Sequence, residues 1–386
     1  MKKRVLFVID SLTCGGAEKS LVSLLPLLNR KKYELYIWMR MQGGAFAPLL
    51  PQDVQIVNNP KYCAFEALCL KIGQLMFSFK LRWNKIIKKK EHLAETLWKC
   101  QGRAMKVPEG KWDIVVAYQQ GVPTYLVAEK FRDCKKLAWI NADIFNAGYN
   151  TIFNSKFYRD FDYICPVSDS LKNKLETHMP KFSSKYNTIW DIINPEVTRL
   201  LAKETCETIK SKNSVHIFAT TGRLVPPKGY DIAIAAAAVL KQKGVYFKWY
   251  FIGEGPERNK IEDAIKEQEL ENNVILLGLQ TNPFKFMTQA DVYVQTSKWE
   301  GFGMTIAEAK ILGKPVVSTN FEVVNNQITN GVNGLIAEMN GESVAEAIYR
   351  MITDSQLRNS IIESVKKENF TRHITECKKV EQLFDE

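Results

Sequence analysis

The stretch KWEGFGMTIAEAKILGKPVV, residues 298–317, carries one full step of an alternating strand and helix pattern. The apolar run DVYVQTS at 291–297 precedes it, a loop follows at 299–303, and residues 304–312 have helical character. Gly313 suits a helix C-cap, and Pro315 opens the next apolar run. We therefore expect a strand, loop, helix and strand here, with the carboxylates Glu300 and Glu308 on either side of a glycine-bracketed turn.

The same alternation runs along the whole chain. The predicted strands before Pro195 are VLFVI 5–9, ELYIWM 34–39, VQIV 54–57, DIVVAY 113–118, KLAWI 136–140, YICPV 163–167 and TIWDII 188–193. Those after it are HIFATTG 216–222, YFKWYFIG 246–253, NVILLG 273–278, DVYVQTS 291–297, PVVST 315–319 and GLIAE 334–338. Most are followed by a turn and a helical pattern, which predicts an α/β fold with parallel sheets.

The restart of the pattern after Asn194 and Pro195 favours two Rossmann-like domains, 1–194 and 195–386. The last helix could pack back on the N-terminal domain. A single eight-fold barrel is the competing architecture, although about 250 residues suffice for one.

Composition is that of a globular protein, with 46% apolar and 25% charged residues in 386. No apolar run approaches the ~20 residues of a membrane-spanning helix. The run at 5–9 breaks at Asp10 without a small-residue cleavage site, so we expect a buried first strand, no signal peptide and a cytoplasmic protein. The eight cysteines form no C-x-x-C pair, which is typical of reduced thiols.

Positive charge is concentrated in the N-terminal half. Residues 1–194 hold 30 Lys and Arg against 17 Asp and Glu, whereas residues 195–386 hold 23 against 25. Basic residues are most closely spaced in a helical insert at 60–110, which has 11 Lys and Arg between 61 and 106. Such a cluster indicates binding to a polyanion or to an anionic surface.

Apolar residues in this insert recur at three- and four-residue steps with basic residues between them. The apolar set is Phe65, Leu68, Ile72, Leu75, Met76, Phe79, Trp83, Ile86 and Ile87; the basic set is Lys71, Lys80, Arg82, Lys85, Lys88, Lys89 and Lys90. The pattern is compatible with a core helix that has a solvated basic face, or with a helix that binds an anionic membrane surface.

Ligands of parallel α/β folds bind at the carboxyl ends of the strands, so the strand-to-helix loops hold the candidate site residues. Gly15 and Gly16 stand where a helix begins, and their amides can approach a ligand closely, although two adjacent glycines alone favour a tight turn. Gly253 ends a strand in the same way.

Two further loops carry charge. Gly222, Arg223 and Lys228 leave a strand end with Pro226 and Pro227 stiffening the link, so two cations can converge on a diphosphate; a solvated turn is the alternative. The amides near Phe302, Gly303 and Met304 lie at a helix N-terminus, which suits a phosphate. Carboxylates accept hydrogen bonds from vicinal hydroxyls, so Glu300 and Glu308 can hold sugar hydroxyls.

We expect no metal site and no cofactor. The four histidines, at 92, 178, 216 and 373, have no metal-ligand spacing. The one D-x-D triplet, Asp160 to Asp162, precedes a predicted strand and is interpreted as a solvated pair at a helix end.

The stretch EGFGMTIAE at 300–308 resembles the E-x7-E motif of the family 4 glycosyltransferases, retaining enzymes of the GT-B fold. The resemblance covers most of the chain outside the 60–110 insert. Its other parts are GGAE 15–18, VSDS 167–170, INP 193–195, GRLVPPKG 222–229, IGEGPER 252–258, LLG 276–278, GKPVVST 313–319 and NGVNG 330–334.

The resemblance implies a nucleotide-sugar donor, a UDP-sugar, held by the C-terminal domain, and an acceptor bound by the N-terminal domain. Glu308 would bind the ribose and Glu300 the transferred hexose, while Arg223 and Lys228 neutralise the diphosphate without a metal. The remaining donor-binding residues would be Gly15, Gly16, Asn141, Gly222, Gly253, Phe302, Gly303 and Met304. Asn141 stands where relatives commonly have a histidine, and asparagine cannot carry its charge.

The implied acceptor is a saccharide or lipid-linked glycan of lipopolysaccharide, capsule or exopolysaccharide synthesis, reached peripherally at the inner face of the membrane. A non-catalytic GT-B subunit that activates a partner transferase is an alternative. A nucleic-acid partner is not expected, because no recognised binding motif accompanies the basic half.

Overall fold

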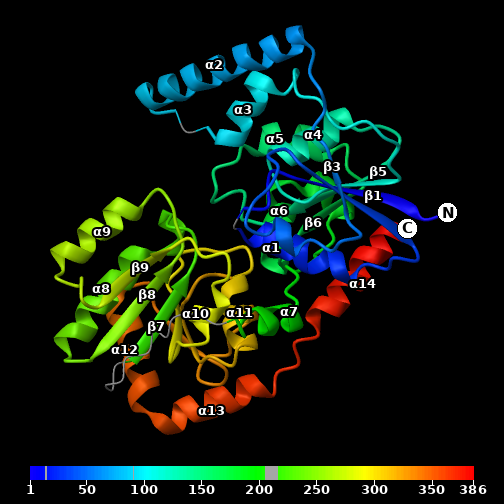
Figure 1. The fold of residues 1–386 in the computed structure, drawn as a ribbon. Coiled ribbons are helices and arrows are strands. Elements are labelled where there is room, and N and C mark those ends of the chain that lie inside the picture. Colours follow the sequence, from blue (N-terminus) through cyan, green and yellow to red (C-terminus); the bar gives the residue numbers. More distant parts are fainter. Residues whose placement is uncertain (14, 90, 205–215) are drawn as a thin grey trace. The chain divides into compact units, whose positions relative to one another are not determined.

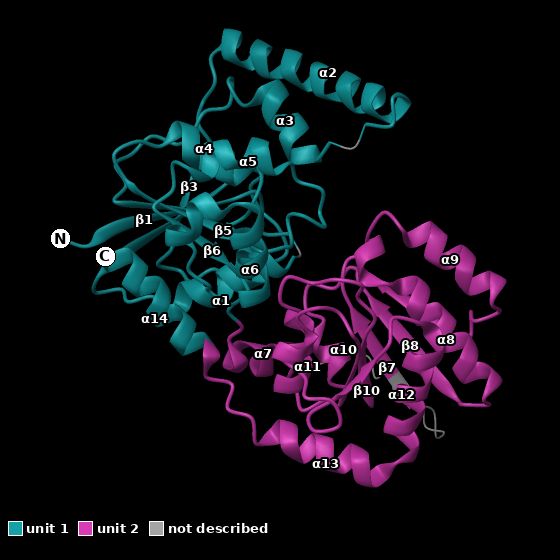
Figure 2. Cartoon of the chain, turned by 180° about the vertical axis from the view of Figure 1, so that it is seen from behind, with its two compact units in different colours: residues 1–192, 373–386 teal, residues 193–372 magenta. Residues whose placement is uncertain are grey.

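The computed structural model describes residues 1–13, 15–89, 91–204 and 216–386. These residues form two compact units, each with its own sheet (Figure 2). Unit 1 comprises Met1–Ile192 and His373–Glu386, and unit 2 comprises Ile193–Arg372. The division lies close to the expected junction at Asn194 and Pro195, and the last helix is part of unit 1.

Unit 1 is built on a six-stranded parallel sheet in the order β3-β2-β1-β4-β5-β6 (Figure 1). The strands are β1 Lys3–Ile9, β2 Tyr33–Met39, β3 Gln55–Val57, β4 Ile114–Ala117, β5 Lys135–Ile140 and β6 Tyr163–Pro166. The helices are α1 Gly16–Leu24, α2 Ala64–Ile86, α3 Leu93–Gln101, α4 Val122–Lys130, α5 Thr151–Tyr158, α6 Asp169–His178 and α14 Arg372–Asp385, with short 3-10 turns η1 Leu25–Leu27, η2 Ala47–Leu49 and η3 Pro180–Lys185.

The central strands of this sheet are apolar on both faces. In β1, Val5 to Ile9 are all buried, and Val5 pairs with Leu35 of β2 on one side and Ile114 of β4 on the other. Parallel strands covered by helices on both faces require this near-continuous apolar run. The carboxyl ends of β1, β4 and β5 consequently meet at one edge of the sheet.

Helix α14 completes the core of unit 1 from the far end of the sequence. Val380 and Phe384 are fully buried, and the Phe384 ring packs edge-on against Tyr33 at 5.4 Å between centroids. The buried Glu376 accepts a hydrogen bond from the backbone N–H of Trp190 at 3.0 Å.

The strand predicted at 188–193 was wrong, because these residues form no strand. Ile189 donates to a strand, at the Pro166 carbonyl at the end of β6 (3.0 Å), but Trp190 donates to Glu376, and Ile192 donates to Ser20 Oγ at 2.9 Å. The apolar run therefore satisfies most of these donors with side chains of α14 and α1 instead of adding a ladder to the sheet.

The insert between β3 and β4 forms two helices, of which α2 packs on α3. Buried Glu91 joins their ends: it accepts from Lys99 Nζ at 2.5 Å and from Asn84 Nδ2 at 3.1 Å. Burial opposes the charge of this carboxylate, but the bonds from Lys99 and Asn84 hold the pKa of Glu91 at about 2. The pair is therefore ionised at neutral pH and fixes the C-terminal end of α2.

Unit 2 repeats the architecture, with a six-stranded parallel sheet in the order β12-β11-β10-β7-β8-β9. The strands are β7 His216–Thr221, β8 Phe247–Ile252, β9 Val274–Gly278, β10 Val292–Gln295, β11 Val316–Thr319 and β12 Leu335–Ala337. The helices are α7 Pro195–Leu201, α8 Tyr230–Gln242, α9 Arg258–Glu267, α10 Phe284–Met287, α11 Met304–Ile311, α12 Gly341–Thr353 and α13 Ser355–Lys366, with η4 Pro226–Lys228 and η5 Val324–Asn326. Two separate sheets confirm the predicted α/β class and exclude a single barrel.

Residues 298–317 and the strand before them have the predicted form. Strand β10 ends at Gln295, a loop follows, α11 begins at Met304, and β11 begins at Val316. Gly313 has φ +69° just after the helix, as a C-cap glycine does. None of the helices in the described ranges is long and apolar enough to cross a bilayer.

A close backbone contact fixes the turn between η4 and α8. Gly229 has φ +64°, and a Cβ added to it would lie 2.0 Å from the carbonyl oxygen of Thr296. Gly244, after α8, has a similar φ of +74°, but nothing lies within 4 Å of its added Cβ. The two glycines share the backbone conformation and differ in the space around them.

We expect Gly229→Ala to lower the free energy of unfolding by roughly 3 kcal/mol or more, because strain and a backbone clash add together. The matched variant Gly244→Ala should cost only the roughly 1–2 kcal/mol of a left-handed alanine. Chemical denaturation of both variants measures the difference. Equal losses would contradict the contact between Gly229 and Thr296.

Candidate functional site

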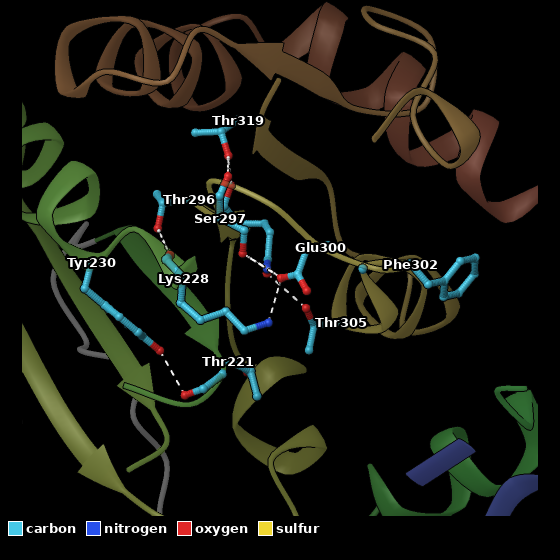
Figure 3. A network of polar contacts seen from close by, with 12 residues as sticks. Thr221, Lys228, Tyr230, Thr296, Ser297, Glu300, Phe302, Thr305 and Thr319 are labelled. Carbon is cyan, nitrogen blue, oxygen red and sulfur yellow. Dashed lines mark hydrogen bonds and ion pairs between the residues drawn. The ribbon is translucent and has the colours of Figure 1, made fainter. Parts of the chain in front are cut away.

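A lysine and a glutamate from different loops form the centre of the candidate site in unit 2 (Figure 3). Lys228 Nζ donates to Glu300 Oε1 at 2.6 Å, and the two side chains are 20% and 13% exposed. Lys228 follows β7 and Glu300 follows β10, and these strands are neighbours in the sheet. Their loops therefore meet at the carboxyl edge, where parallel α/β folds bind ligands.

Glu300 is held by the end of the strand before it. Its Oε1 also accepts from Ser297 Oγ at 2.6 Å and from Gln295 Nε2 at 2.8 Å. Thr305 of α11 donates to Gln295 Oε1 at 2.9 Å, which joins the helix to the same network. All three bonds to Glu300 are made to Oε1, so the carboxylate has one fixed orientation and presents Oε2 separately.

Glycine at 222 and 253 allows the loops around Lys228 to approach one another. A Cβ on Gly222 would lie 3.4 Å from Cδ and Cε of Lys228, so the aliphatic part of the lysine lies along this residue. Gly253 has φ +154°, and a Cβ there would lie 1.9 Å from the carbonyl oxygen of Gly222. Tyr230 donates to that same oxygen at 3.0 Å. A side chain at Gly253 would clash with the Gly222 backbone, whereas a Cβ at Gly222 would make only ordinary contact with Lys228.

Arg223 differs from Lys228 in its surroundings. It is exposed, and its guanidinium makes no hydrogen bond or ion pair with another described residue. The loop thus supplies one cation that is already paired and one that is available to an anionic ligand.

The E-x7-E stretch places its two carboxylates in different environments. Glu300 lies in a loop and is partly exposed, whereas Glu308 lies within α11 and is fully buried. Gly303, with φ +85°, caps the start of α11, and Gln327 Nε2 donates to the carbonyl oxygens of Phe302 and Gly303. The side chains of Phe302 and Met304 are buried, so these residues can offer a ligand only their backbone.

Unit 1 holds the other three predicted donor residues. Gly15 caps the start of α1 next to Gly16, but a Cβ on Gly15 would lie 2.2 Å from Glu18 Oε2. A carboxylate therefore already lies at this helix N-terminus, where it interacts favourably with the helix dipole. An anionic ligand at Gly15 and Gly16 would meet like charge, which the sequence pattern alone did not reveal.

Asn141 follows β5 and is held by its backbone, which donates to Gln120 Oε1 at 3.0 Å. Its side-chain Oδ1 and Nδ2 are shielded from solvent and have no hydrogen-bond partner among the described residues. Leaving buried polar atoms unpaired costs about 1–3 kcal/mol each. A ligand that bonded this amide would recover that energy, so Asn141 remains a candidate binding residue.

Sequence reasoning missed Gln295, Ser297 and Thr305, which orient Glu300. The available signal was the polar triplet QTS at the end of the apolar run 291–297, because polar side chains at the carboxyl end of a buried strand are unusual unless they bind something. No group of three His, Cys, Asp or Glu in the described part of the chain is arranged to hold a metal ion.

The arrangement can bind a molecule that carries both an anion and hydroxyl groups. Arg223 and Lys228 supply positive charge for the anion, while Glu300 supplies an acceptor for a hydroxyl. A phosphate next to a sugar has this combination of groups.

Comparison with known proteins agrees with this chemistry. A Campylobacter jejuni protein named N-acetylgalactosamine-N,N'-diacetylbacillosaminyl-diphospho-undecaprenol 4-alpha-N-acetylgalactosaminyltransferase is 25% identical over 363 residues, 93% of each chain. An uncharacterized glycosyltransferase of Methanocaldococcus jannaschii is 31% identical over 168 residues, 42% of this chain and 41% of the relative. The chain thus spans less than half of that relative's length.

Solved structures share the fold of the whole chain. Anabaena Alr3699/HepE, crystallised with UDP and glucose, superposes with a TM-score of 0.71 over 99% of both chains at 18% identity. This likeness confirms the predicted GT-B fold. The model of the family described as glycosyl transferases group 1 matches residues 202–368, which include Arg223, Lys228, Glu300 and Glu308. Over these residues the chain is similar to the glycosyl transferases group 1 family.

Proposed function

We propose that the protein is a retaining glycosyltransferase that moves a hexose from a UDP-sugar to a saccharide or lipid-linked acceptor in surface glycan synthesis. The observation that carries the proposal is the pair of Lys228 and Glu300, 2.6 Å apart and held at the carboxyl edge of the unit 2 sheet. A diphosphate and the adjoining sugar present an anion and hydroxyl groups that match these two side chains.

In the proposed reaction the bond between the sugar C1 and the β-phosphate oxygen breaks, and the acceptor oxygen bonds to C1 on the same face. The acceptor proton passes to the departing phosphate. Lys228 and Arg223 stabilise the negative charge that develops on the diphosphate, and fixed cations in a partly desolvated site do so without reorganisation. Glu300 orients the sugar by accepting from its hydroxyls through Oε2.

The donor and acceptor classes are supported by similar proteins. UDP and glucose are the ligands named for the Anabaena structure, and the Campylobacter relative is named for a diphospho-undecaprenol acceptor. Other relatives are named for capsular polysaccharide synthesis in Staphylococcus aureus and lipopolysaccharide core synthesis in Rhizobium meliloti. We propose the same kind of pathway here, with Glu308 holding the ribose and the backbone at Phe302, Gly303 and Met304 near a phosphate.

Asn141 is proposed to bind a hydroxyl of the transferred sugar. Its two side-chain atoms lack partners, and an amide can both donate to and accept from a hydroxyl. We further propose that the protein binds peripherally to the anionic inner face of the membrane, where a lipid-linked acceptor would be presented. The basic charge of unit 1 and the exposed apolar side chains of α2 support this location.

Removing either cation tests the proposed stabilisation of the leaving group. We expect Lys228→Ala and Arg223→Ala each to reduce UDP release from the preferred UDP-sugar by at least ~100-fold, the scale of losing one charge-stabilising group. A thermal-shift screen of UDP-sugars identifies that donor, because a bound ligand raises the apparent stability.

The matched control is Lys298→Ala. Lys298 lies in the loop beside Glu300, and its Nζ is 2.7 Å from Asp231, so it is also a paired lysine. Its side chain is not placed in the site, and turnover should stay near the parent value. Near-normal turnover in both Lys228→Ala and Arg223→Ala would overturn the proposed role of the cations.

Activity should persist in excess EDTA, because Arg223 and Lys228 are proposed to supply the charge that a divalent ion supplies in other transferases. The measurement is UDP release with and without EDTA after extensive dialysis. Loss of activity in EDTA and recovery with Mn²⁺ would mean that a metal, not the two cations, holds the diphosphate.

A further inference from the structure

Helix α2 presents a continuous apolar face to solvent. Leu75, Phe79 and Ile86 are 71%, 68% and 72% exposed, which is far more than a core helix allows. The remaining exposed apolar residues of this face are Phe65, Leu68, Ile72, Met76 and Trp83, with Ile87 directly after the helix. Exposed apolar patches of this size on soluble proteins mark interaction surfaces. The alternative of a core helix with a solvated basic face is therefore wrong for this face.

The opposite side of α2 is the one that packs on the protein. Gly73 is buried, and a Cβ there would lie 2.7 Å from the carbonyl oxygen of Cys100. Asn84 is buried against Glu91, and Leu70 packs on the unit 1 core. Figures 1 and 2 both place α3 between α2 and the rest of unit 1. The helix is anchored by one side, so its second apolar side is held outward.

Basic residues border the exposed apolar face. With 3.6 residues per turn, Lys71 and Arg82 lie along one edge of the face and Lys85 lies beyond them. Lys80, which also pairs with Glu91 at 3.5 Å, lies along the other edge. Lys88 and Lys89 follow the end of the helix, and both are exposed. The only acidic residue of α2, Glu66, lies on the packed side and pairs with Lys106 at 2.6 Å.

We infer that α2 inserts its exposed apolar face into the headgroup region of an anionic lipid bilayer. An apolar stripe with cationic borders matches the interface, where acyl chains lie beneath negative headgroups. A second copy of the chain is a poorer occupant, because two facing α2 helices would bring their basic borders together without carboxylates to pair with them. The inference deepens the proposed function, on which it rests for the lipid-linked acceptor.

Insertion differs from electrostatic adsorption in its response to salt. Salt screens the attraction between exposed cations and a charged leaflet, whereas it does not weaken the burial of apolar side chains. A protein that inserts α2 therefore keeps part of its membrane affinity when the ionic strength is high.

Vesicle sedimentation of the full chain tests the inference. The variant Leu75→Ser/Phe79→Ser/Ile86→Ser changes only exposed side chains, so the fold should persist. Its partition onto phosphatidylglycerol–phosphatidylcholine vesicles at high salt should fall by at least ~10-fold, since a few buried apolar groups set the affinity of interfacial helices. The matched control is Ile152→Ser/Leu200→Ser/Tyr246→Ser, whose parent side chains are 76%, 66% and 77% exposed elsewhere; it should bind like the parent.

A charge variant, Lys71→Gln/Arg82→Gln/Lys85→Gln, should bind less at low salt and like the parent at high salt. Several results would overturn the inference: no vesicle binding by the parent, binding by the parent that high salt abolishes, or equal binding by the parent and the triple serine variant. A lipid-free dimer of the parent that the triple serine variant converts to monomer would assign the face to a second copy instead.

UDP release from the UDP-sugar, measured without lipid, separates this inference from the proposed function. The triple serine variant should release UDP like the parent. If the parent binds vesicles but releases no UDP, the proposed donor chemistry is wrong and the insertion of α2 is supported. If the parent releases UDP but does not bind vesicles, the insertion of α2 is wrong and the proposed donor chemistry is supported.

Discussion

The hydrogen bonds to Glu300 Oε1 organise the carboxyl edge of unit 2. This one oxygen accepts from Lys228, Ser297 and Gln295, and so joins the loop after β7 to the end of β10. Gln295 also links this network to α11, because its Oε1 accepts a hydrogen bond from Thr305 of that helix. A bond from a charged donor is worth more than a neutral one, and a network in which each member is satisfied is rigid. The orientation of Lys228 and the start of α11 therefore depend on one carboxylate.

Close backbone contacts at two glycines position the loops that carry Lys228 and Glu300. Gly229 and Gly253 bring loop backbones against Thr296 and Gly222 at distances that no side chain tolerates. Thr296 Oγ1 donates to the carbonyl oxygen of Lys228 at 3.1 Å. This bond fixes the backbone of the lysine beside the contact between Gly229 and Thr296. The cation is thus placed by backbone geometry before any ligand arrives, which is what stabilisation of a developing charge requires.

The fold was predictable because its strands are short apolar runs bounded by turns, and burial on both faces of a parallel sheet imposes that pattern. The run at 188–193 was mispredicted for the same reason. Its apolar side chains are buried, but after the bond from Ile189 to β6 its backbone donates to side chains distant in sequence, Glu376 and Ser20. Arg223, Lys228 and Glu300 could be named as candidates from their loops. The direct contact between Lys228 and Glu300 could not, since only the adjacency of β7 and β10 brings them together.

Periodicity could not decide the role of α2 because this helix is apolar on two sides. Leu70, Phe77 and Leu81 lie on the packed side, while Phe65, Leu75 and Phe79 lie on the exposed side, and both sets repeat at helical spacing. A pattern of this kind is compatible with a core helix until burial is known. The buried Gly73 and Asn84 settle which side packs, because a glycine in mid-helix is unfavourable unless close packing requires it. A helix so anchored keeps its other apolar side uncovered, and removing these large side chains from water on binding a partner is favourable.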